Sequence, residues 1–490
     1  MRRCCLLDDG SRGWILGSYS SYEPRALKRA TPWVTYTIIV VNVVVYLITS
    51  APSGFIAISS WWVEVGGFAP ILLVVDSANI YRFFTSMFLH GDIFHIFFNM
   101  YFLYLFGRGV EGALGSKRYL ILYLLSGIGA AIFHTAYSYL LGGARALMVP
   151  AIGASGAISG VLGAYLILYP GTKLTACTWF ILPVCFTLYS AYFLLLWFAF
   201  QVFYGYTSVG AGIAFMAHAG GFVAGIALLG LLADRHRIRL LRALSGGGSL
   251  FGFIRYVFGS VQQREGLSIG VKVAVALLIF LLSAGALAGT FYSMEYQATF
   301  DVAKISVSKD GDYSVGYVFY QWRHMRPILL GRDLVDPNVR VLLNRLYAAG
   351  LLYEPGYSGK QIRIVGEMLH GVIPVCGTEV AIVIYIDEFI GTYDERGLLV
   401  EGRGTIRSPI INVIERPFFC SYEITDDIYR FDFSLTTYMG VNPAPLALEF
   451  SVVSLLLSLV SLYIVLWRDK ELVITPVGAS TVGSEGFVPL

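Results

Sequence analysis

Residues 153–164 read Gly-Ala-Ser-Gly-Ala-Ile-Ser-Gly-Val-Leu-Gly-Ala, and residues 217–225 read Ala-His-Ala-Gly-Gly-Phe-Val-Ala-Gly. In both stretches small residues recur every four positions and so share one face of a helix: Gly156, Gly160, Gly221 and Gly225. Small-residue faces let two helix backbones approach closely in a bilayer. The pattern therefore predicts two transmembrane helices that pack on one another.

The composition of the whole chain indicates a membrane protein. Of its 490 residues, 56% are apolar and only 14% are charged, whereas soluble domains carry about 25% charged residues. A string of soluble domains and an intrinsically disordered chain are both excluded. The net charge of +3 is too small to favour a nucleic-acid partner, and the six cysteines show no metal-type spacing. We expect no cleaved signal peptide, because no apolar run with a cleavage site follows Met1.

Eight stretches are long and apolar enough to cross a bilayer, which takes about 20 residues. All eight are expected to be helices, because hydrocarbon offers no partner to an open sheet edge. Lys and Arg in the short loops place both termini in the cytoplasm. The predicted spans are 33–50, 94–112, 118–141, 150–170, 174–203, 209–233, 271–292 and 446–467.

The predicted fold class is an all-α polytopic membrane protein: a six-helix bundle, two extra transmembrane helices and an extracytoplasmic α+β domain. The loop 51–93 also lies outside, and its aromatic residues suit the membrane interface. The expected segments are a cytoplasmic N-terminal segment 1–32, a six-span core 33–235, a cytoplasmic linker 236–270, a seventh helix 271–292, the extracytoplasmic domain 293–445, an eighth helix 446–467 and a cytoplasmic tail 468–490.

The extracytoplasmic domain has mixed charge and signals for both kinds of secondary structure. Residues 336–350 begin with Asp-Pro and end on Gly, which predicts one helix. Residues 379–386 and 409–414 are typical of strands. Cys376 and Cys420 either form a disulfide, which the compartment permits, or remain two free buried thiols.

Polar side chains inside a span indicate function, because lipid makes them costly to keep. A serine alone is usually a packing residue, but Ser155 and His218 are both flanked by close-packing small residues at matching depth. Packing of the two helices on those faces would bring the two side chains within reach of one another. An imidazole in contact with a serine hydroxyl can accept its proton and later deliver it to a leaving amine. We predict a Ser–His dyad, because no acidic residue of the spans is placed to orient His218. The whole polar set is His95, Asn99, His134, Ser155 and His218, with Glu111 near a helix end.

Acyl transfer also needs hydrogen-bond donors for an oxyanion. His95 and Asn99 are four residues apart, so they share one face of span 94–112 and offer two donors. The backbone N–H of Ser155, near its helix N-terminus, adds a third. On its own, the His–Asn pair would be an interhelical hydrogen-bond contact.

Rival chemistries lack their residues. The sequence has no His-Glu-x-x-His string for a zinc protease and no pair of buried aspartates for an aspartyl protease. A transporter would need ion-coordinating carboxylates at mid-membrane, and the spans have none placed for this.

These residues, in this order, resemble the rhomboid intramembrane serine proteases over about residues 30–235. The matching motifs are Arg82-Phe83-Phe84-Thr85, Phe88-Leu89-His90, His95-Ile96-Phe97-Phe98-Asn99-Met100, Gly107 with Glu111 and Gly115, Gly153-Ala154-Ser155-Gly156 and Ala217-His218-Ala219-Gly220-Gly221.

The resemblance implies a protease that cleaves transmembrane substrates near a helix end within the bilayer, with no metal and no cofactor. Span 174–203 and the loop 204–208 would form its moving gate. The implied residue roles are Ser155 as nucleophile, His218 as base, His95, Asn99 and the Ser155 amide as oxyanion donors, His90 as a structural residue and Glu111 as a loop anchor.

The alternative function is a non-proteolytic rhomboid-like protein that binds membrane clients. Such proteins typically lose the serine or the histidine, and this chain has both. One departure from the family is Ser159, which stands where some members have an aromatic residue that stacks on the histidine. The extracytoplasmic domain is expected either to recruit substrates or to cap the core.

Overall fold

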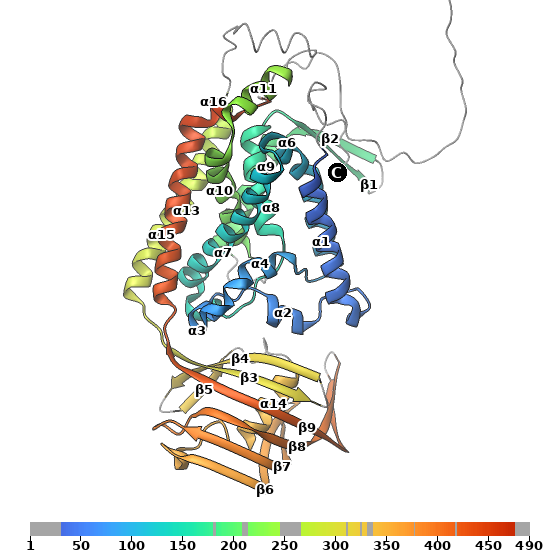
Figure 1. Ribbon diagram of the computed structural model, residues 1–490, viewed down its shortest axis with the longest axis vertical. Coiled ribbons are helices and arrows are strands. Elements are labelled where there is room, and N and C mark those ends of the chain that lie inside the picture. The colour runs from blue at the N-terminus through green and yellow to red at the C-terminus, as the bar shows by residue number, and fades with distance from the viewer. Residues whose placement is uncertain are drawn as a thin grey trace, which may run out of the picture.

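The computed structural model describes residues 31–179, 183–207, 214–245, 266–309, 312–323, 326–330, 337–376, 378–416 and 419–475. A bundle of helices carries a β-rich domain at one end and the helix α11 at the other (Figure 1). The N-terminal segment 1–32 lies almost wholly outside the described residues. So do residues 246–265 of the expected linker, residues 209–213 of the sixth predicted span, the helix cap Asp336 and most of the tail.

Within the described residues, six helical stretches are long and apolar enough to cross a membrane. Inside an α-helical stretch the backbone needs no outside polar partner, because each N–H meets a carbonyl one turn earlier. The six are α1 (Trp33–Ser50), α5 (Ile93–Phe102) continued through a π turn (Leu103–Gly107) into α6 (Arg108–Leu114), α7 (Ser116–Ala146), α10 (Phe215–Leu232), α13 (Ile269–Glu295), and α15 (Ala444–Tyr463) continued through a second π turn (Ile464–Arg468) into α16 (Asp469–Leu472).

Two further apolar helices belong to the same bundle and are shorter. They are α8 (Ser155–Leu168) and α9 (Ser190–Thr207). The loop that follows α1 contains the short helices α2 (Ser60–Gly66), α3 (Ile71–Val75) and α4 (Arg82–Thr85), and α11 (Arg235–Ser245) forms the start of the expected linker 236–270.

The prediction of one continuous helix over 174–203 is wrong. The strands β1 (Lys173–Trp179) and β2 (Pro183–Tyr189) form an antiparallel hairpin, and α9 begins only at Ser190. Hydrophobicity cannot separate a buried strand from a helix in a short apolar run. The β-branched residues of this run and Pro183, which lacks a backbone N–H, favour the strands.

The β-domain, defined here as residues 300–441, is an antiparallel sheet with one helix packed on it. Within the described residues its strand order is β5-β4-β3-β9-β8-β7-β6. The predicted strands 379–386 and 409–414 lie inside β7 and β8 and are confirmed. The strands are β3 (Phe300–Lys309), β4 (Asp312–Arg323), β5 (Arg326–Leu330), β6 (Gln361–Val375), β7 (Thr378–Tyr393), β8 (Leu399–Arg416) and β9 (Phe419–Val441).

The helix predicted at 336–350 is α14 (Pro337–Ala348), and its apolar stripe faces the sheet. Four stripe residues are fully buried: Val339, Leu342, Leu343 and Leu346. Cys376, just after β6, is disulfide-bonded, so it is not the free thiol of the second alternative. The side chain of Cys420 lies outside the described residues.

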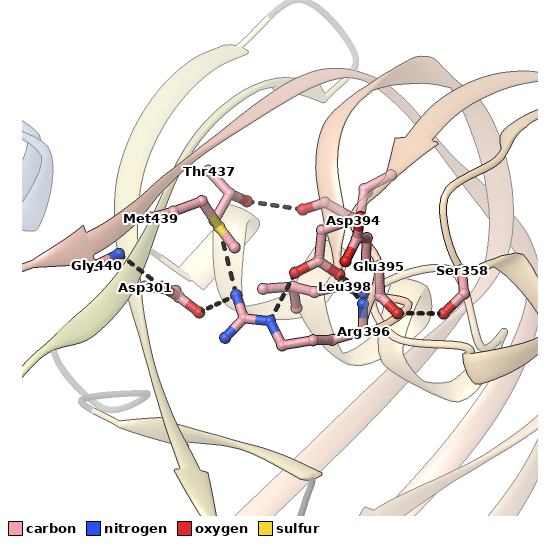
Figure 2. A network of polar contacts seen from close by, with 10 residues as sticks. Asp301, Ser358, Asp394, Glu395, Arg396, Leu398, Thr437, Met439 and Gly440 are labelled. Atoms are coloured by element: carbon pink, nitrogen blue, oxygen red, sulfur yellow. Dashed lines mark hydrogen bonds and ion pairs between the residues drawn. The ribbon is translucent and has the colours of Figure 1, made fainter.

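The turn between β7 and β8 lies beside the start of β3 and the end of β9 (Figure 2). Arg396 in this turn forms ion pairs with Asp394 at 2.7 Å and with Asp301 at 2.8 Å. The other oxygen of Asp301 accepts the backbone N–H of Gly440 at 2.8 Å. These contacts fix the two points where the chain enters and leaves the domain, near the start of β3 and the end of β9.

Candidate functional site

Ser155 is the first residue of α8, and a tight backbone turn places it there. The prediction that span 150–170 is helical throughout is wrong at its start, because Gly153 has a φ of +122° that helices do not allow. Before this turn, Ala151 exchanges two backbone hydrogen bonds with Phe68, and the Gly153 N–H donates to Ser86 at 2.8 Å. The first loop therefore holds the strand-like segment that presents Ser155.

Close packing of α8 on α10 positions the side chains of Ser155 and His218. A Cβ added to Gly225 would overlap the backbone carbonyl of Gly160, and one added to Gly221 would overlap that of Gly156. The two backbones thus touch where the sequence predicted small-residue faces. The His218 Nε2 atom lies 2.8 Å from the Ser155 Oγ atom.

The second ring nitrogen of His218 also has a partner. Its Nδ1 atom lies 2.9 Å from the Oε1 atom of Gln201 on α9. Gln201 is not among the site residues predicted from the sequence, because that prediction considered only acidic partners for His218. The available signal was an uncharged amide in an apolar span, which is as unusual in lipid as a histidine. The Trp197 ring lies beside His218, with ring centroids 6.2 Å apart.

His95 faces the space next to Ser155. A Cβ built on Gly153 would lie 2.7 Å from the His95 Nε2 atom and 3.5 Å from the Ser155 Oγ atom, so this space exists because residue 153 has no side chain. The Gly91 N–H donates to His95 Nδ1 at 3.3 Å. In a neutral imidazole one nitrogen accepts and the other carries the proton. The His95 Nε2–H is therefore a donor next to the space beside Gly153.

Asn99 lies one turn further along α5 and is buried. Its Nδ2 atom donates to the backbone carbonyl of His95 at 3.0 Å. One amide N–H of Asn99 is thereby used within its own helix, and the oxyanion role of the second N–H stays a prediction. The start of α5 is fixed by Asp92, whose carboxylate accepts the N–H groups of Phe94 and His95 at 2.9 Å each.

His90 is fully buried behind these groups. Its Nε2 atom accepts the Ala154 N–H at 3.5 Å, and its ring meets the His95 ring edge-on at 5.1 Å. Burial lowers the pKa of His90 to about 3, so the ring is neutral and can accept this hydrogen bond at ordinary pH. His90 thus supports the residue that precedes Ser155.

Glu111 lies at the opposite end of the bundle and anchors the first helix. Its carboxylate accepts the backbone N–H groups of Val34 at 3.1 Å and Thr35 at 2.8 Å, at the start of α1. It also accepts the Ser116 hydroxyl at 2.6 Å, at the start of α7. A carboxylate at a helix N-terminus is stabilised by the helix dipole.

The site therefore joins four elements: α5 with His95, α8 with Ser155, α9 with Gln201 and α10 with His218. Within the described residues, His95 and His134 are the titratable side chains that act electrostatically on His218. His134 lies on α7. Within the described ranges, no group of three His, Cys, Asp or Glu side chains could hold a metal ion.

Comparison with known proteins identifies a Rhomboid domain at residues 77–235, which contains Ser155, Gln201 and His218. RHOMBOID-like protein 1 of Arabidopsis thaliana is 34% identical over 108 residues, which cover 22% of this chain and 26% of that protein. Rhomboid protease AarA of Providencia stuartii is 35% identical over 111 residues, which cover 19% of this chain and 40% of that protein. Rhomboid protein 1, mitochondrial, of Saccharomyces cerevisiae is 37% identical over 100 residues, which cover 20% of this chain and 27% of that protein. The chain thus spans less than half the length of each of these relatives.

Proposed function

The chain belongs to the rhomboid family, and from this premise we propose that it is an intramembrane serine endopeptidase. It cleaves transmembrane proteins near the outer membrane–water interface through Ser155 and His218. One observation carries the proposal: the 2.8 Å contact between the Ser155 hydroxyl and a His218 imidazole that has its own fixed orientation. A hydroxyl is a weak nucleophile until a base in hydrogen-bond contact accepts its proton.

The proposed reaction has two halves. Ser155 Oγ attacks the scissile carbonyl as its proton moves to His218 Nε2, and the tetrahedral intermediate collapses when His218 gives that proton to the leaving amine. The product is an acyl-enzyme on Ser155. A water molecule then attacks the ester, with His218 accepting and returning a proton, and releases the second fragment. These steps require no metal and no cofactor.

The negative charge of the tetrahedral intermediate needs donors that are already in place. The Ser155 N–H at the start of α8, the His95 Nε2–H and the second Asn99 N–H are the proposed oxyanion donors. Loss of one such donor typically costs about 100- to 1000-fold in kcat. The space beside Gly153, between His95 and Ser155, supports this assignment.

The test is labelling and cleavage by the full chain in lipid. A fluorophosphonate probe should label the protein at Ser155 and not in Ser155→Ala, and a single-span reporter should be cut by wild type and not by His218→Ala. The matched control is Ser159→Ala: Ser159 lies one turn along α8, and its hydroxyl bonds back to the Ser155 carbonyl at 2.6 Å. Labelling that persists in Ser155→Ala, or a wild type with neither labelling nor cleavage, contradicts the protease and leaves the client-binding alternative.

The protein is a multi-pass integral membrane protein, and we place it in a cell membrane with both termini cytoplasmic. The arginines of α11 and the β-domain lie at opposite ends of the bundle (Figure 1), which supports an extracytoplasmic β-domain by the positive-inside rule. Protease added outside intact cells should cut the β-domain and spare a C-terminal tag. The reverse pattern contradicts this orientation.

A further inference from the structure

We propose that Gln201 is a positioning residue that fixes the tautomer and the direction of the His218 ring. The inference rests on the proposed function, because it concerns the same histidine. It adds a third member, an uncharged amide on α9, to the pair expected from the sequence. Gln201 does not touch the scissile bond; it acts only through His218.

The geometry supplies one partner for each ring nitrogen. Nε2 of His218 lies 2.8 Å from Ser155 Oγ, and Nδ1 lies 2.9 Å from Gln201 Oε1. Gln201 is itself buried, with 7% of its surface exposed. An amide held out of water needs a hydrogen-bond partner, and His218 provides it.

The proton positions follow from the role of the base. Nε2 can accept the Ser155 proton only if it is bare, and the neutral ring must then carry its proton on Nδ1. A buried N–H without an acceptor destabilises the fold. The Oε1 atom of Gln201 accepts this N–H, so it stabilises the one tautomer in which His218 can act as a base.

Aromatic packing holds Gln201 level with His218. Phe198 on α9 stacks on Phe222 of α10 with ring centroids 4.3 Å apart and planes 12° apart. Gln201 follows Phe198 by three residues, and Phe222 follows His218 by four, in helices that run in opposite directions. The stacked pair thus lies about one turn from the Gln201–His218 contact and sets its register.

A purely structural interhelical hydrogen bond is the competing explanation, and two substitutions separate it from positioning. Gln201→Leu keeps the volume and removes the acceptor, whereas Gln201→Glu keeps the acceptor and adds a charge. The control is Thr290→Val on α13, outside the site and the predicted gate, which removes a hydroxyl that donates to the Ala286 carbonyl at 3.0 Å.

We expect Gln201→Leu to lower kcat about 10- to 100-fold with KM changed less than about twofold, because a misdirected base slows chemistry and not binding. Gln201→Glu should recover most of the rate. In Gln201→Glu, the fall of kcat/KM at acid pH should begin about one pH unit or more higher than in wild type, since a carboxylate favours the imidazolium form of His218. His95 and His134 remain as the other titratable neighbours of His218 in every variant. Gln201→Leu with wild-type kcat and pH profile overturns the inference.

A second measurement does not depend on proteolysis. Nitrogen-15 NMR of the full chain with labelled histidine, assigned with His218→Ala, reports which ring nitrogen carries the proton. We expect an Nδ1–H signal in wild type and in Thr290→Val, and its loss in Gln201→Leu. An Nε2–H ring in wild type overturns the inference even if the protein cleaves its reporter. An Nδ1–H ring in a protein that neither labels nor cleaves overturns the proposed function alone.

Discussion

Gly153 is the residue whose missing side chain keeps the space between His95 and Ser155 open. Its φ is +122°, and an added Cβ would lie 2.7 Å from His95 Nε2. Gly153→Ala should therefore block the proposed oxyanion position and lower kcat about 100-fold or more. The measurement is cleavage of the single-span reporter, with folding followed by thermal melting.

The matched control for this substitution is Gly143→Ala. Gly143 also has a positive φ, +65°, but nothing lies within 4 Å of an added Cβ. Both variants carry a backbone penalty of about 1–3 kcal/mol, whereas only one crowds His95. Equal activity losses in the two would show that backbone strain, and not occupation of the space, is responsible.

The burial of His90 makes the stability of the fold depend on pH. Its pKa is lowered from 6.5 to about 3 by burial. Below pH 6.5 the unfolded chain therefore binds a proton that the folded chain does not, and stability falls as the pH drops toward 3. When the pH is lowered from 7 to 4.5, the free energy of unfolding of His90→Gln should fall by about 2–3 kcal/mol less than that of wild type. Melting temperatures across this range measure the difference, and parallel curves for the two proteins would contradict it.

At the scale of elements, the contact between α8 and α10 determines whether the site forms. A Cβ on Gly225 overlaps the Gly160 backbone, whereas a Cβ on Gly270 of α13 meets nothing within 4 Å. Alanine usually stabilises a helix over glycine by about 0.5–1 kcal/mol. Gly270→Ala should therefore raise the free energy of unfolding. Gly225→Ala should lower it by about 1–3 kcal/mol, because the added Cβ overpacks the contact between α8 and α10.

The readout for this pair is thermal melting together with probe labelling of Ser155. Gly225→Ala should lose labelling as well as stability, because separating the helices lengthens the Ser155–His218 contact. A Gly225→Ala protein that melts and labels like Gly270→Ala would show that the two backbones do not touch.

The helices beyond the rhomboid domain pack tightly against it. The Tyr137 hydroxyl of α7 donates to the Leu282 carbonyl of α13, and the Ser461 hydroxyl of α15 donates to the Val223 carbonyl of α10 at 2.6 Å. On α9, which also carries Gln201, the Tyr206 hydroxyl donates to the Leu281 carbonyl at 2.9 Å. If α9 is the gate that the family resemblance implies, α13 restrains its motion.

At the scale of the whole molecule, the β-domain docks on the part of the core that presents Ser155. Arg145 donates to the Gln321 side chain of β4 at 3.0 Å, and Tyr139 donates to the Tyr296 carbonyl, just before the domain begins, at 2.5 Å. Beside them, side chains of the first loop, of the segment that follows α7 and of the β-domain share one buried cluster. Its members include Ile71, Leu72, Leu147, Met148, Phe300, Val302, Phe319 and Val441.

Removing the β-domain should therefore destabilise the core and change its activity. Phe300 and Val441 are paired across β3 and β9, so a short Gly/Ser linker can replace residues 300–441 without moving α13 or α15. A cap predicts faster cleavage of a generic reporter after deletion, and a recruiting surface predicts a changed order of preferred substrates. A truncated protein with unchanged melting, rate and preference would contradict both roles.

The sequence by itself determined the membrane class, most of the helices and the pairing of Ser155 with His218. Composition, span length and the spacing of Gly156, Gly160, Gly221 and Gly225 are local properties, and lipid permits few structures that satisfy them. The β-domain strands at 379–386 and 409–414 were predictable for the same reason, because a short run rich in Val and Ile is a local signal.

Only the tertiary structure decided where α8 begins, that β1 and β2 form a hairpin, and that Gln201 meets His218. The start of α8 and the Gln201 contact depend on other segments of the chain: the first on the strand-like pairing with Phe68, and the second on the Phe198–Phe222 stack. An apolar run has the same hydrophobicity as a strand or as a helix, and an amide in it has no partner until another helix packs beside it. Such contacts leave no periodic signal along the chain.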